Sequence, residues 1–151
     1  MHLVEAYATN CGLKIDRPYM YEKFFPLNVE KYITLHPFTK PAKSYDYWQE
    51  VVNLLLPVLE KENIRLIQIG AKDEPKISGA GYTAGQTNMN QIAYLIKGGL
   101  LHLGVDSFPT HVASAYDKKI VCLYSSNHLA CTKPYWGDPE DHVLFMPDLK
   151  G

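Results

Sequence analysis

An acid, a hydroxyl and a histidine lie close together between a short apolar run and a run typical of a helix. Asp106 and Ser107 come directly before Phe108 and Pro109, and His111 follows within the first turn of the expected helix. The free N–H groups and the dipole of a helix N-terminus favour an anion. The same dipole disfavours a charged His111, which predicts either a neutral imidazole or one that is paired with a bound anion. The segment predicts either a phosphate site or an ordinary helix cap made by the acid and the hydroxyl.

Two further segments follow apolar runs and carry groups that bind phosphate or sugar. Lys40, Lys43 and the hydroxyl of Thr39 are within reach of a phosphate at the same edge of a sheet, or form a solvated loop. Glu74 follows the second run, where an acid can hold ribose hydroxyls or simply lie in solvent. No GxGxxG follows the first run, which disfavours a nicotinamide enzyme.

The elements that must position these residues alternate between strands and helices. Strands are expected at 32–35, 64–69, 100–103, 120–124 and 143–146, and helices at 2–11, 45–61, 89–98 and 109–116. Ser44 and Asn88 are the expected N-caps of two of these helices, and Pro57 is expected to kink or shorten the first of them. Alternation with short apolar strands predicts an α/β fold, a Rossmann-like parallel sheet with helices on both faces. Such sheets bind ligands at the carboxyl ends of their strands.

Composition narrows the class of protein. The chain has 151 residues, of which 46% are hydrophobic and 21% charged, and its formal net charge is -1. There is no global basic field, so nucleic acid is not an expected partner. The three cysteines form no CxxC pair and no zinc spacing, and Cys122 is expected to be a buried, inert thiol. Without a signal peptide or a run near the roughly 20 residues of a membrane span, the sequence predicts a cytoplasmic protein with no transmembrane segment.

Taken in order, these segments resemble the C-terminal, donor-binding half of the heptosyltransferase-like glycosyltransferases of family 9, which have the GT-B architecture. The strongest match is Asp106–Ala115, similar to the family's Asp-Ser/Thr-Gly-x-x-His-x-Ala-x-Ala. The segment His36–Tyr45 resembles His-x-x-Thr-x-x-x-Lys-x-Trp, with Tyr45 in place of the last aromatic residue, and Gly70–Glu74 resembles Gly-x-x-x-Glu. The resemblance covers about residues 30 to 145, including a helix over 87–95 that would border the base pocket.

The resemblance implies a nucleoside diphosphate sugar as ligand, with no metal and no cofactor. It implies that Thr39 and Lys43 contact the diphosphate, that Glu74 holds the ribose, and that Thr87 and Asn88 line the base pocket. The phosphate and sugar loop would then consist of Asp106, Ser107, Phe108, Pro109 and His111. Lys43 and the helix N-terminus would stabilise the charge that develops on the leaving nucleoside diphosphate.

Two departures from the family pattern qualify that expectation. Phe108 stands where the family has a glycine, and a phenylalanine needs more room, which predicts a reshaped loop or a different sugar. Nothing matches the family's N-terminal domain, which carries the acceptor site and the catalytic base. Residues 1–29 are therefore expected to be a linker or packing arm, and residues 30–151 the nucleotide-sugar-binding domain.

The prediction is a donor-binding domain for hexosyl or heptosyl transfer to a glycan or lipopolysaccharide-type acceptor, inactive without its partner domain. The full-length enzyme could then lie peripherally at the inner membrane face. The alternative is a stand-alone, non-catalytic nucleotide-binding or assembly module. A third candidate, a sugar-nucleotide epimerase of similar architecture, lacks support because the sequence shows no additional cluster of acids and histidines.

Overall fold

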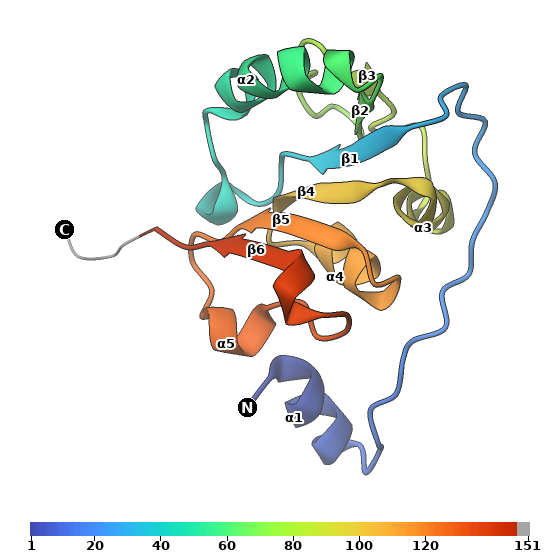
Figure 1. Ribbon diagram of the computed structural model, residues 1–151. Coiled ribbons are helices and arrows are strands. Elements are labelled where there is room, and N and C mark those ends of the chain that lie inside the picture. Colours follow the sequence, from blue (N-terminus) through green and yellow to red (C-terminus); the bar gives the residue numbers. More distant parts are fainter. Residues whose placement is uncertain (148–151) are drawn as a thin grey trace.

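The computed structural model describes residues 1–147, so residues 148–151 of the expected 30–151 domain lie outside the described part of the chain. Its sheet has six parallel strands in the order β3-β2-β1-β4-β5-β6 (Figure 1). The strands are β1 (Tyr32–His36), β2 (Arg65–Gln68), β3 (Gly81–Tyr82), β4 (Leu101–Val105), β5 (Lys119–Leu123) and β6 (His142–Phe145). This all-parallel sheet confirms the predicted Rossmann-like α/β class.

The helices are α1 (Leu3–Asn10), α2 (Trp48–Lys61), α3 (Met89–Gly98), α4 (Phe108–Ala115) and α5 (Leu129–Thr132), with 3-10 turns η1 (Pro41–Lys43) and η2 (Pro139–Asp141). None of the helices within residues 1–147 combines the length and hydrophobicity needed to cross a membrane.

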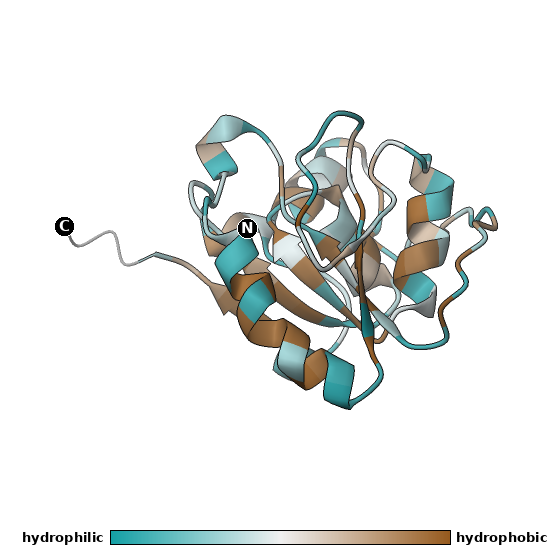
Figure 2. Ribbon diagram, turned by 90° about the horizontal axis from the view of Figure 1, so that it is seen from above, coloured by the Kyte–Doolittle hydropathy of each residue, from teal (hydrophilic) through white to brown (hydrophobic). Residues whose placement is uncertain are grey.

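The core consists of two apolar layers, one on each face of the sheet. On one face Leu35 packs with Trp48 of α2, and on the other Ile120 packs with Ile96 of α3 and Val112 of α4. Successive side chains of a strand point to opposite faces, so a short apolar strand can serve both layers. Helix α2 packs on the sheet with one face, and its ribbon shows alternating hydrophobic and hydrophilic bands (Figure 2).

Helix α2 begins later than the sequence predicts. Ser44 is not its N-cap and Tyr45 is not its first residue, because α2 begins at Trp48. Pro41 fixes the backbone of the preceding η1 turn, and the Ser44 hydroxyl donates to the Pro41 carbonyl oxygen at 2.9 Å. Ser44 therefore ends η1 instead of starting a helix, and Lys43 lies within a tight turn.

Pro57 does not shorten α2, which continues to Lys61. Pro57 and Asn53 both lie on the exposed side of the helix, so water can reach the Asn53 carbonyl that loses its N–H partner. Four short elements, η1, β3, α5 and η2, were not predicted, because two to four residues are too few to show a period.

The predicted caps next to the site are partly confirmed. Asn88 caps α3 by accepting from the Gln91 N–H at 2.9 Å, while the Asn88 N–H donates to the Gln91 side chain. Ser107 occupies the N-cap position of α4, with Pro109 in the first turn, but its side chain makes no capping hydrogen bond. The two helices therefore begin differently, although both begin at the same edge of the sheet.

The N-terminal segment packs along the domain, from α1 near α5 to the start of β1 (Figure 1). His2 donates from Nε2 to the Lys133 carbonyl oxygen at 2.8 Å, and Arg17 donates to the Ala115 carbonyl oxygen at 3.0 Å. Phe25 and Leu27 add apolar contacts to the layer that contains α3 and α4. The segment is thus tied to the domain at several points.

Candidate functional site

Two adjoining cavities open at the carboxyl ends of β1, β2 and β4, where ligands bind in folds of this class. The wide cavity has a volume of about 690 Å³ and a largely apolar lining. The polar cavity, of about 360 Å³, contains a lysine pair, an acid and a histidine. Thr39, Ser107 and Phe108 line both cavities, so the two meet at the start of α4.

The structure brings all of the predicted site residues to these cavities. The wide cavity takes Thr39, Glu74, Thr87, Asn88, Ser107, Phe108 and Pro109. The polar cavity takes Thr39, Lys43, Asp106, Ser107, Phe108 and His111. Their placement agrees with the prediction, and their roles toward a ligand remain predictions.

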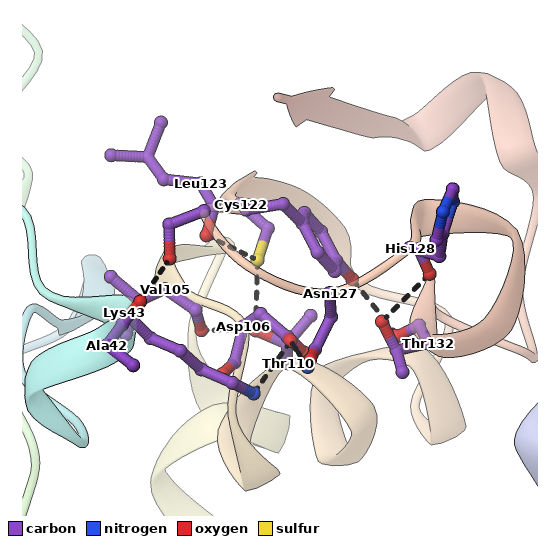
Figure 3. Close-up of polar contacts among 12 residues, drawn as sticks. Ala42, Lys43, Val105, Asp106, Thr110, Cys122, Leu123, Asn127, His128 and Thr132 are labelled. Atoms are coloured by element: carbon purple, nitrogen blue, oxygen red, sulfur yellow. Dashed lines mark hydrogen bonds and ion pairs between the residues drawn. The ribbon is translucent and has the colours of Figure 1, made fainter. Parts of the chain in front are cut away.

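A buried carboxylate organises the polar cavity. Lys43 Nζ lies 2.8 Å from Asp106 Oδ2 and 3.1 Å from the Asp106 carbonyl oxygen (Figure 3). Asn127 Nδ2 donates to the same Oδ2 at 2.6 Å. The Asp106 side chain is 5% exposed and that of Lys43 is 24% exposed. The carboxylate is therefore shielded from solvent, whereas the Lys43 side chain is partly accessible to it.

The start of α4 is open toward the cavities. Asp106 and Ser107 do not cap it through their side chains, because the Asp106 carboxylate is engaged with Lys43 and Asn127. Thr110 directs its hydroxyl to the Val105 carbonyl oxygen, at 3.2 Å. The ordinary-cap interpretation is therefore wrong, and the helix dipole is left without a side-chain cap among the described residues.

His111 lines the polar cavity from the first turn of α4. Burial lowers its pKa, and this effect outweighs the opposing influence of the Asp106 carboxylate. The position of His111 in the first turn of α4 also favours the neutral ring. A neutral imidazole can donate one hydrogen bond and accept another. Within residues 1–147, no three His, Cys, Asp or Glu side chains are grouped so as to hold a metal ion.

In the wide cavity, Glu74 is held over a glycine. The Ala71 N–H donates to Glu74 Oε1 at 3.0 Å, whereas Glu74 Oε2 and the Thr87 hydroxyl have no partner among the described residues. Burial raises the pKa of Glu74 against the effect of the Ala71 N–H. A Cβ at Gly70, whose φ is +155°, would collide with the Glu74 carboxylate. Glu74 is thus folded back into the cavity rather than extended into solvent.

His36 was missed as a site residue. It ends β1, is 7% exposed and lines the wide cavity, and its Nδ1 has no partner among residues 1–147. Burial lowers the pKa of His36 to about 4, so the ring is neutral. The sequence did hold a signal for this residue, because His36 is the first residue of the segment His36–Tyr45 that resembles the family pattern.

His102 lies behind His36, on the same face of the sheet, and is fully buried. Its Nδ1 is 2.9 Å from the Thr34 hydroxyl, but its Nε2 has no partner within the described chain. His102 is therefore a core histidine with one ring nitrogen left without a partner among the described residues.

Asn127 was missed as well. It lies in the loop after β5, lines the polar cavity and reaches Asp106 across 21 residues of sequence. No motif marks it, and its contact with Asp106 depends on β4 and β5 being neighbours in the sheet.

Comparisons with known proteins give a family match for the sequence and similar folds among solved structures. The sequence profile of glycosyltransferase family 9 (heptosyltransferase) matches residues 7–144. No curated protein matches the sequence of this chain. Solved structures are similar in fold at low sequence identity. The glycosyl transferase family 9 from Veillonella parvula has a TM-score of 0.65 at 13% identity, with 95% of this chain covering 39% of that one.

Two Escherichia coli enzymes are similar to the same extent. ADP-heptose LPS heptosyltransferase II has a TM-score of 0.63 at 17% identity, with 93% of this chain covering 42% of that enzyme. Heptosyltransferase WaaC with ADP has a TM-score of 0.64 at 15% identity, with 95% of this chain covering 48% of it. The chain thus spans less than half the length of each of these three structures.

Proposed function

This chain belongs to glycosyltransferase family 9, and from that premise we propose that it binds the nucleoside diphosphate sugar donor of a glycosyl transfer reaction. The observation that carries the proposal is the meeting of a wide, mostly apolar cavity and a charged, polar cavity at the uncapped start of α4. A donor of this class has the same order of parts: a flat base with ribose, then a diphosphate, then a hydroxylated sugar.

The wide cavity suits the nucleoside. Its apolar lining includes Phe38, Met89 and Ile92, which can pack on a base. Glu74 Oε2 and the Thr87 hydroxyl are buried and unpartnered within the described chain, and an unpaired buried polar atom is unfavourable. Ribose hydroxyls would supply the missing partners.

The diphosphate would lie where the cavities meet. Thr39 and Ser107 offer hydroxyl groups there, the N-terminus of α4 favours an anion, and Lys43 offers a cation from the polar side. Asp106 cannot accept from a phosphate oxygen, because both are acceptors at neutral pH. Its carboxylate would therefore face hydroxyls of the sugar.

Transfer of the sugar leaves a nucleoside diphosphate whose terminal phosphate gains negative charge as its bond to the sugar breaks. Lys43 and the start of α4 would stabilise that charge, since both are held in place before the reaction. The donor needs no metal or cofactor in this scheme. The acceptor and the base that activates it would come from a second domain, and the acceptor would be a glycan or lipid-linked glycan.

A non-catalytic nucleotide-binding module would use the same two cavities. The placement of all the ligand-facing residues on this chain is compatible with such a module. Assembly with a partner domain that restores transfer would favour the enzyme, whereas binding without transfer in any such assembly would favour the module.

Titration calorimetry with ADP-glucose, GDP-mannose and UDP-glucose tests the proposal. We expect one of them to bind in the micromolar to millimolar range and to compete with its own nucleoside diphosphate. Lys61→Met is the control, because Lys61 is exposed at the end of α2, at the opposite edge of the sheet. If none of the three donors binds at millimolar concentration, the donor-binding proposal is wrong.

A further inference from the structure

Two donors converge on one oxygen of the buried Asp106 carboxylate. Lys43 Nζ reaches Asp106 Oδ2 from the η1 turn at 2.8 Å, and Asn127 Nδ2 reaches it from the loop after β5 at 2.6 Å (Figure 3). Asp106 as a whole is 4% exposed. A charge buried to this degree is stable only when it is compensated.

Lys43 has two possible hydrogen-bonding partners, Asp106 and a bound diphosphate. In the structure it directs N–H groups to Asp106 Oδ2 and to the Asp106 carbonyl oxygen. A diphosphate entering at the start of α4 would attract the same ammonium group, which is partly exposed on that side. Each N–H that turns to the phosphate is lost to Asp106.

We propose that Asn127 is a positioning residue that keeps the Asp106 carboxylate compensated while Lys43 is shared with the diphosphate. The proposal rests on the proposed donor-binding function. The amide donates without adding positive charge, so it holds Asp106 in place and does not compete with Lys43 for the phosphate. Asp106 can then keep its orientation toward the sugar throughout binding.

A purely structural role for Asn127 is less consistent with the contacts around it. The loop is fastened without it, because the Ser125 hydroxyl donates to the Ala42 carbonyl oxygen at 3.1 Å. The Tyr124 hydroxyl likewise donates to the Thr132 carbonyl oxygen, at 3.2 Å. Asn127 is therefore not needed to hold the loop against the domain, and its bond to Asp106 is the one that reaches the site.

The decisive experiment measures nucleoside diphosphate affinity by calorimetry in two backgrounds. Asn127→Ala should weaken binding about tenfold, since one hydrogen bond to a charged group is lost when Lys43 is drawn away. In the Asp106→Asn background there is no carboxylate to compensate, so the same substitution should change affinity by less than about twofold. Ser126→Ala, an exposed neighbour in the same loop, is the matched control.

Asn127→Ser keeps a donor and should give an intermediate affinity, and thermal unfolding confirms that each variant is folded. The proposal would be overturned if Asn127→Ala weakened binding equally in the unmodified and the Asp106→Asn backgrounds, or if it caused no loss in the unmodified chain. Absence of donor binding by the unmodified chain would instead overturn the proposed function, and this proposal with it.

Discussion

Replacing Lys43 with methionine removes the ammonium group and keeps most of the aliphatic stem. The Asp106 carboxylate then loses its 2.8 Å partner and, among residues 1–147, keeps only the Asn127 amide. Losing one hydrogen bond to a buried charge costs about 1.5–3 kcal/mol, and the 24% exposure of Lys43 places the loss near the lower end. For a domain of this length that is a fall in Tm of roughly 3–8 °C.

The effect on binding should exceed the effect on stability. The diphosphate loses a charge-assisted hydrogen bond and meets an Asp106 carboxylate that no cation offsets. We therefore expect the Kd for the donor to rise about 10- to 100-fold.

Calorimetry on Lys43→Met and on the exposed control Lys61→Met, at a temperature where both are folded, measures this effect. Lys61→Met should bind as the unmodified chain does. Equal affinity of all three proteins would refute the placement of the diphosphate beside Lys43, even if the fall in Tm were as large as expected.

Three further outcomes follow from the burial of single groups. Gly70→Ala should weaken donor binding and lower stability by about 1–3 kcal/mol, since the new Cβ displaces the Glu74 carboxylate; calorimetry and urea unfolding measure both. Burial lowers the pKa of His36 to about 4 and of His102 to about 3. As pH falls below about 6.5, the unfolded chain therefore takes up protons before the folded chain does. The free energy of unfolding should drop by up to about 1.4 kcal/mol per pH unit for each histidine between pH 6 and 4. A shallower dependence of that free energy on pH in His102→Gln would confirm that His102 contributes to it. Burial raises the pKa of Cys122 to about 12, so a thiol reagent should modify the two exposed cysteines of the folded protein and reach Cys122 only in urea.

Much of the fold could be predicted because local signals and burial agree in it. The alternation of short apolar strands with helices predicted the parallel sheet, and Asn88 predicted the start of α3 through its capping chemistry. Ser44 misled for a related reason. A serine before a helical pattern is a good N-cap, but Pro41 had already imposed a 3-10 turn that used the Ser44 hydroxyl.

The site could be predicted residue by residue but not contact by contact. Asp106 and Lys43 were both expected near phosphate, yet the structure pairs them with each other across 63 residues of sequence. The Asn127 contact depends on the placement of β5 beside β4, and no spacing in the sequence shows it. The sequence did not predict His36 as a site residue. Its burial makes the ring neutral and leaves Nδ1 unpartnered within the described chain, and that burial arises only in the folded sheet.

The pairing of Lys43 with Asp106 also explains how a nearly neutral chain can hold an anion. Asp106 is the single acid among the residues that line the polar cavity, and it is compensated before any ligand arrives. In the proposed complex, the charge of the donor would be met by Lys43, which is partly exposed, by Lys40, which also lines the polar cavity, and by the N-terminus of α4, whose dipole no side chain within residues 1–147 caps. A carboxylate accepts hydrogen bonds from hydroxyl groups and repels phosphate. The position of Asp106 in the polar cavity therefore favours a sugar over a phosphate as its neighbour. In the proposed complex, the sugar hydroxyls would therefore lie beside the Asp106 carboxylate, and the phosphates beside the Lys43 ammonium and the N-terminus of α4.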